Sequence, residues 1–168
     1  VASSNDAIAA AASSAGGQAL LDKMNEQAKT LGLAQTYFLN PTGLDLTPET
    51  AGAYGSAHDM AVPTAAFLKA PPEIFETTVN DTILVGPSKH AVVATSTSVS
   101  IHDVSGLIGA KTGYTDLAGG NLVAVFDADI GHPLIAVVLH STEKGRFDDM
   151  HTLVEAARAS LAAAAASR

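Results

Sequence analysis

The stretch that decides the fold runs from residue 107 to residue 126 and reads LIGAKTGYTDLAGGNLVAVF. Two runs rich in aliphatic and β-branched residues, Leu107 to Thr112 and Asn121 to Phe126, predict strands. The connection between them, Gly113 to Gly120, with a turn at Gly119-Gly120, exceeds the commonest hairpin loops but is too short for a helical crossover. We therefore predict that the two strands pair antiparallel.

The rest of the chain extends this pair into a meander flanked by helices. A third strand-like run, Leu134 to His140, follows the short connection Asp127 to Pro133. Apolar residues at spacings of three and four, and alanine-rich ends, predict helices elsewhere. These helices are Ala7 to Ala15, Gly17 to Leu33 with its end near Gly32, Ala57 to Leu68 with Ser56 as its cap, and Arg146 to Ala165.

The remaining segments predict turns and short strands. Asn40-Pro41-Thr42-Gly43 is a turn signature, because proline fixes φ and glycine permits positive φ. Pro71-Pro72 is expected to stop the preceding helix, and Thr77 to Ile108 to hold short strands and loops. The last helix is expected to cover the sheet with one apolar face, made of Phe147, Met150, Leu153, Val154, Ala157 and Leu161.

This order of elements predicts an α+β domain in which helices precede an antiparallel sheet and one further helix covers it. We expect one domain over residues 1–168, with an alanine-rich helix end at 156–168. The chain carries 9 Lys+Arg against 17 Asp+Glu, a net charge of −8, and no cysteine. Because phosphate backbones are bound mainly by basic clusters, a nucleic-acid partner is not expected, and thiol chemistry is excluded.

Two short motifs carry candidate chemistry. Lys111-Thr112-Gly113, at the end of a predicted strand, offers a cation, a hydroxyl and an unobstructed backbone, which together can hold a peptide's terminal carboxylate. Ser3 and Asn5 could present a hydroxyl and a carboxamide to the same cleft if the backbone there is extended. Taken separately, these triplets are better explained as a helix cap and a solvated strand end, because both features are common.

Other candidates are weaker. The stretch from Gly106 to Thr112 lacks the glycine that a phosphate loop places directly before its lysine. The six histidines form no H-E-x-x-H or comparable cluster, so no metal site is expected.

Together with their context, the motifs resemble the serine-type D-alanyl-D-alanine carboxypeptidases, the low-molecular-mass penicillin-binding proteins. Four blocks occur in the family's order: Ser3 to Ala7, similar to its S-x-N segment; Phe38 to Asp45, similar to its N-P-x-G-L turn; Tyr54 to Ala61; and Gly109 to Asp116, continuing through Asn121 to Val123. Ser141 to Met150 resembles the junction before the C-terminal helix. The resemblance implies a β-lactamase/transpeptidase-like fold, which is N-terminally truncated here. It also implies an enzyme that uses no cofactor.

The resemblance also implies an activity, in which a serine attacks D-Ala-D-Ala peptides of peptidoglycan and penicillins acylate the same serine. Lys111 and Thr112 would bind the terminal carboxylate beside Gly113, and the Tyr114 N–H would donate to the oxyanion. Ser3 would pass a proton to the leaving amine, and Asn5 would hold the substrate amide. Such enzymes act outside the cytoplasmic membrane, in the periplasm or on the wall side.

One departure stands out, because the family's nucleophile lies in an S-x-x-K helix upstream of S-x-N, and only Val1 and Ala2 precede Ser3. The S-x-x-K that the chain does contain, Ser141 to Lys144, follows the K-T-G strand and is interpreted as a strand end with a helix cap. We expect a carboxypeptidase whose nucleophile is absent from this chain. The alternative is a non-catalytic module that binds wall peptide termini, and a penicillin-hydrolysing enzyme is a weaker third choice.

Overall fold

The computed structural model describes residues 5–69, 77–86, 91–129 and 131–167. Two helices, α1 (Asn5–Ser14) and α2 (Gln18–Thr30), precede a small sheet of β1 (Tyr37–Phe38) and β2 (Ala53–Tyr54). Helix α3 (Ala57–Phe67) follows and packs against β7 (Pro133–Ser141). Ser56 caps α3 as expected, since its hydroxyl accepts a hydrogen bond of 3.1 Å from the Asp59 N–H. Pro71-Pro72 lies outside the described residues.

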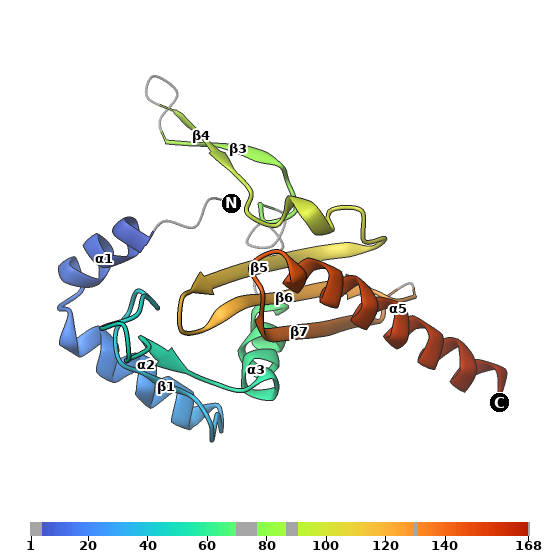
Figure 1. Ribbon diagram of the computed structural model, residues 1–168, viewed down its shortest axis with the longest axis horizontal. Helices are drawn as coiled ribbons and strands as arrows, with labels where there is room; N and C mark the ends of the chain where they lie inside the picture. Colours follow the sequence, from blue (N-terminus) through green and yellow to red (C-terminus); the bar gives the residue numbers. More distant parts are fainter. Residues whose placement is uncertain (1–4, 70–76, 87–90, 130, 168) are drawn as a thin grey trace.

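A projecting hairpin and the main sheet make up the second half. The hairpin consists of β3 (Thr82–Val85) and β4 (Val92–Thr95), and a short 3-10 turn, η1 (Val99–Ile101), leads from it to the sheet (Figure 1). Strands β5 (Leu107–Thr115), β6 (Gly119–Asp127) and β7 form an antiparallel sheet in the order β5-β6-β7. Helix α5 (Gly145–Ala166) lies across one face of this sheet (Figure 1). The predicted meander and covering helix are confirmed.

The connection between β5 and β6 differs from the prediction. Only Asp116 to Ala118 joins the strands, because the ladder continues through the Thr115↔Gly119 and Tyr114↔Gly120 pairs. Gly119 and Gly120 are therefore strand residues. Their lack of a side chain lets β6 lie close to the residues at the end of β7. A Cβ on Gly120 would lie 2.1 Å from the Thr142 carbonyl oxygen.

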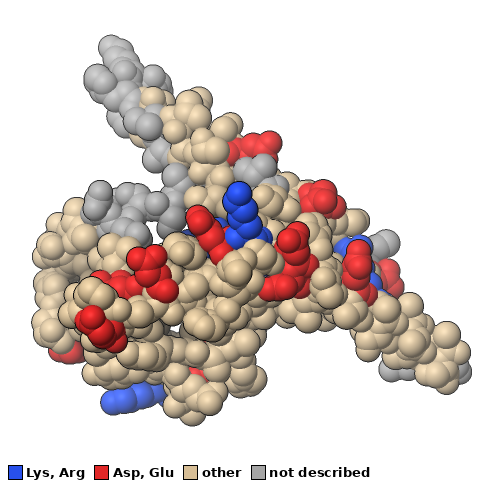
Figure 2. Space-filling view, in the orientation of Figure 1, with Lys and Arg blue, Asp and Glu red and all other residues tan. Residues whose placement is uncertain are grey.

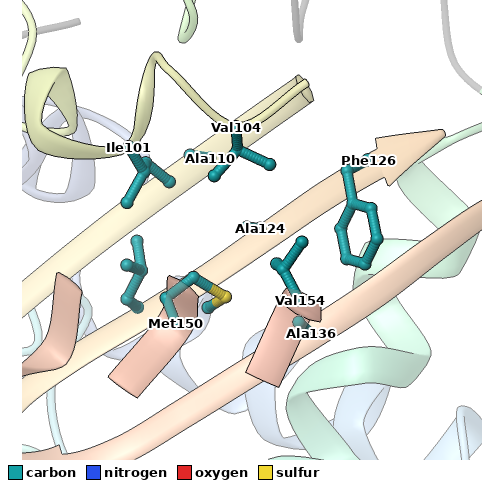
Figure 3. Packing of buried hydrophobic residues seen from close by; sticks show 9 residues of the cluster. Ile101, Val104, Ala110, Ala124, Phe126, Ala136, Met150 and Val154 are labelled. Carbon is teal, nitrogen blue, oxygen red and sulfur yellow. The ribbon is translucent and has the colours of Figure 1, made fainter. Parts of the chain in front are cut away.

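The core lies between α5 and the sheet. Alternation along β6 directs Leu122, Ala124 and Phe126 to this side, where Met150 and Val154 of α5 meet them (Figure 3). The buried cluster comprises Ile101, Val104, Ala110, Leu122, Ala124, Phe126, Ala136, Met150 and Val154.

The predicted apolar face of α5 is only partly correct, because Leu153 and Leu161 remain exposed. In Figure 1 the C-terminal turns of α5 run past the sheet. None of the helices in the described ranges combines the length and apolar character that a membrane span requires.

Candidate active site

The Lys111-Thr112-Gly113 segment lies on β5, at an edge of the main sheet. Lys111 and Gly113 are exposed, whereas Thr112 is buried, with its hydroxyl 2.6 Å from that of Thr97. The Lys111 ammonium donates a hydrogen bond to the Thr112 carbonyl. Lys111, Thr112 and Gly113 all line a cavity of about 490 Å³, as does Thr97. A cation and two hydroxyls therefore converge on one cavity, and Thr97 shows that the segment before β5 contributes to it.

Arg146, in the first turn of α5, also lines this cavity but is absent from the site residues predicted from the sequence. Its side chain is buried, lies 4.9 Å from the centre of the Phe147 ring, and donates a hydrogen bond of 2.8 Å from Nη1 to the Gly113 carbonyl oxygen. A cation in the first turn of a helix opposes the helix dipole. This unfavourable position of a cation is visible in the sequence and could have indicated a functional role for Arg146.

The two cations influence each other. Desolvation lowers the pKa of the Lys111 ammonium below its ordinary value, although the side chain keeps solvent contact, and the nearby Arg146 charge lowers that pKa further. Basic side chains are scarce in this acidic chain, and the face shown in Figure 2 carries more acidic than basic ones. Two cations held near each other at one cavity therefore form a positive spot suited to an anionic group.

The predicted turn, which the structure confirms, forms another part of the cavity wall. Asn40 Oδ1 accepts hydrogen bonds from the N–H groups of Thr42 and Gly43 at 2.9 and 2.8 Å, and Asn40 Nδ2 donates to the Leu44 carbonyl at 2.7 Å. Gly43 has a φ of 75°, which favours glycine. Residues 41–44 face the same cavity as the K-T-G segment. Tyr114 also lines the cavity and is 48% exposed, while the role of its N–H stays a prediction.

The amino-terminal candidates are only partly described. Ser3 lies outside the described residues. Asn5 is the first residue of α1, so the backbone is helical there and the extended pairing proposed for Ser3 and Asn5 is wrong at Asn5. The side chain of Ile8, one turn further along α1, lines the cavity. Helix α1 therefore borders the K-T-G cavity.

The S-x-x-K sequence inside the chain has the structural role that the sequence predicts. Ser141 ends β7, and its hydroxyl donates a hydrogen bond of 2.5 Å to Asp149 Oδ2. Thr142 Oγ1 accepts from the Gly145 N–H at 2.8 Å, and Lys144 directly precedes α5. Neither Ser141 nor Lys144 lines the K-T-G cavity. A strand end and a helix start account for these four residues.

Comparison with known proteins identifies the family to which the chain belongs. The family model described as D-alanyl-D-alanine carboxypeptidase matches residues 1–143. The chain belongs to this family. Among curated D-alanyl-D-alanine carboxypeptidases, DacF of Bacillus subtilis is 40% identical over 118 residues, which cover 68% of this chain and 29% of DacF. DacB2 of Mycobacterium tuberculosis is 32% identical over 143 residues, which cover 84% of this chain and 48% of DacB2.

Solved structures of D-alanyl-D-alanine carboxypeptidases and penicillin-binding proteins share the fold. The carboxypeptidase from Mycobacterium tuberculosis has a TM-score of 0.71 and 29% identity, over 83% of this chain and 52% of that one. Penicillin-binding protein D2 from Listeria monocytogenes, in its cefotaxime-bound form, has a TM-score of 0.68 and 32% identity, over 80% of this chain and 53% of that one. The chain thus spans about half or less of the length of these relatives.

Proposed function

We propose that residues 1–168 form the part of a serine-type D-Ala-D-Ala carboxypeptidase that binds the substrate's terminal carboxylate, with the nucleophile supplied by an S-x-x-K helix outside these residues. The observation that carries the proposal is the convergence of Lys111, Arg146 and the hydroxyl pair of Thr112 and Thr97 on one cavity. A carboxylate is the anion that a peptide's C-terminus presents, and paired cations with hydroxyl donors bind it strongly.

The strand edge adds a second element of recognition. Within the main sheet β5 pairs only with β6, and the Ala110 N–H is already bonded to the Thr78 hydroxyl. An extended peptide can therefore lie along the other edge of β5 near residues 112–114. Gly113 carries no side chain, so the peptide backbone can approach closely there. A peptide ending at Thr112 and Arg146 would then pass Tyr114, and its last amide bond would lie beside the strand.

The proposed reaction is an acyl transfer. The serine hydroxyl adds to the carbonyl carbon of the last amide bond, and terminal D-alanine leaves with the proton that Ser3 passes to its nitrogen. Asn5 holds the substrate amide, the Tyr114 N–H stabilises the oxyanion, and water hydrolyses the acyl-enzyme. Lys111 binds the terminal carboxylate together with Thr112, because both residues line the same cavity.

Two further proposals follow from the relatives. Penicillin-binding protein D2 from Listeria monocytogenes has been solved in cefotaxime-bound and ampicillin-bound forms. We propose that β-lactams acylate the longer protein in the same way, since their carboxylate would occupy the place of the peptide terminus. We also propose an extracytoplasmic location, because peptidoglycan peptides are found there.

The binding step can be tested on the 168-residue chain. We expect N-acetyl-D-Ala-D-Ala to bind in a calorimetric or NMR titration, and its C-terminal amide to bind much more weakly because the amide lacks the carboxylate. Equal binding of the two peptides, or no binding of either, would contradict the proposed site.

The catalytic step requires a comparison with the longer protein. We expect labelled penicillin to attach covalently to a protein that includes an upstream S-x-x-K helix and not to residues 1–168. If no such helix precedes Val1 and the chain still binds the peptide, the non-catalytic wall-peptide module is the correct function. Covalent labelling of the 168-residue chain itself would show that its nucleophile lies within it.

A further inference from the structure

The carboxylate of Asp45 joins the two walls of the K-T-G cavity without lining the cavity itself. Asp45 Oδ1 accepts a hydrogen bond of 2.9 Å from the Thr115 hydroxyl, and Asp45 Oδ2 accepts one of 3.2 Å from the Leu117 N–H. Thr115 is the last residue of β5, and Leu117 lies in the loop to β6. One side chain therefore connects the end of the turn segment to the tip of the hairpin that carries the K-T-G residues.

The turn segment is ordered by its own contacts. The Asn40 side chain holds residues 42–44 through the hydrogen bonds described above. Gly52 packs closely against this segment, since a Cβ there would lie 2.1 Å from the Leu44 carbonyl oxygen and 2.6 Å from Asn40 Nδ2. These contacts connect residues 40–44 to one another, and Asp45 connects them to the end of β5 and the loop after it.

The hairpin tip is ordered as well. Thr115 Oγ1, while donating to Asp45, accepts a hydrogen bond of 3.0 Å from the Ala118 N–H. The Asn121 side chain donates to the carbonyl oxygens of Ala118 and Gly119 at 3.3 and 2.9 Å. Because both connected parts are rigid, a change at Asp45 would alter the distance between the walls more than the shape of either wall.

We propose that Asp45, acting with Thr115, is a positioning residue that sets the width of the peptide groove and thereby its selectivity for small side chains. The inference rests on the proposed function, because it concerns the peptide that would lie between residues 41–44 and residues 113–115. A groove of fixed width admits the methyl group of D-alanine and excludes branched side chains. A groove whose wall can move discriminates less.

The test compares two peptides on the 168-residue chain, N-acetyl-D-Ala-D-Ala and N-acetyl-D-Leu-D-Ala. We expect the unaltered chain to bind the first about tenfold or more tightly, the usual range for a pocket that discriminates by side-chain size. Asp45→Ala and Thr115→Val, which each break the Asp45–Thr115 hydrogen bond, should lower this ratio to about twofold. Thr115→Ser keeps the hydroxyl and should preserve the ratio.

Two controls separate groove width from general stability. Asp116→Ala removes the same charge from the neighbouring loop residue, which is exposed and does not line the cavity, and should preserve the ratio. The double variant Asp45→Ala/Thr115→Val should lose less than the sum of the two single-variant losses, because both changes remove the same Asp45–Thr115 hydrogen bond. Melting temperatures, measured in parallel, show how much each variant destabilises the fold.

Three results would overturn the inference, and they are distinguishable. If Asp45→Ala lowers the melting temperature but keeps the ratio, the residue stabilises the fold without setting selectivity. If the unaltered chain binds both peptides equally, the groove does not select by size. If it binds neither peptide, the proposed function fails, and the role of Asp45 in that function fails with it.

Discussion

Replacing Arg146 by methionine tests the carboxylate site most directly, because methionine keeps much of the side-chain bulk and removes the charge. Arg146 is 7% exposed and lines the cavity from the first turn of α5. A hydrogen bond to a charged group contributes about 1.5 to 3 kcal/mol. If Arg146 binds the peptide carboxylate, the dissociation constant of N-acetyl-D-Ala-D-Ala should rise about 10- to 150-fold.

The effect of Arg146→Met on stability should be smaller than its effect on binding, because two contributions oppose each other. The variant loses the hydrogen bond to the Gly113 carbonyl oxygen. It also removes a buried cation whose Nε finds no hydrogen-bond partner among the described residues and which repels Lys111. The same loss of repulsion should raise the pKa of Lys111 towards its ordinary value, which NMR titration of the lysine can follow.

The assay is a calorimetric titration of the peptide and of its C-terminal amide at pH 7. Arg158→Met is a matched control, because Arg158 also lies on α5 and near an aromatic ring, 5.6 Å from the centre of Phe126, but does not line the cavity. We expect the control to bind as the unaltered chain does. The reasoning is refuted if Arg146→Met binds the acid as tightly as the unaltered chain, or if it weakens binding of the acid and the amide equally.

Three further outcomes are expected. Binding of the acid peptide should weaken as pH rises through the Lys111 pKa, which lies below its ordinary 10.5, and Lys111→Arg should remove this loss because arginine stays charged. Met150→Ala should lower the free energy of unfolding by about 2 to 5 kcal/mol in denaturant titrations, and Met150→Leu by less than about 1.5 kcal/mol. Burial would raise the pKa of Asp59, but hydrogen bonds from Gln35 and Thr36 and the nearby His58 lower it overall. Its stabilising effect is therefore present above pH 3.8 and lost as pH falls through the lowered pKa, so Asp59→Asn should reduce the melting temperature more at pH 7 than at pH 3.

Much of the architecture could be predicted because it is encoded locally. Ser56 caps α3, Asn40 closes its turn, and the runs Leu107 to Thr112 and Asn121 to Phe126 specify strands β5 and β6. Each signal lies within a few residues of the structure that it specifies. The K-T-G segment could also be predicted locally, because its three residue types alone indicate a cation, a hydroxyl and an unobstructed backbone.

What could not be predicted depends on contacts between distant positions. Arg146 reaches Gly113, 33 positions earlier, and Asp45 reaches Thr115, 70 positions later. Gly119 and Gly120 suggested a turn because their close approach to the end of β7 leaves no trace in the sequence near them. The local sequence pattern does not determine long-range packing. The sequence therefore did not reveal the role of Arg146 or the position of the loop between β5 and β6.

The C-terminal part of α5 has a practical consequence. The helix has 22 residues, about 33 Å at 1.5 Å per residue, and its buried residues, Arg146, Met150 and Val154, all lie in its first half. The alanine-rich second half contributes little to the core, so a fluorophore or an immobilising tag attached near its end would report on the protein without disturbing the cleft. Surface-tethered binding measurements can use this helix as a built-in spacer.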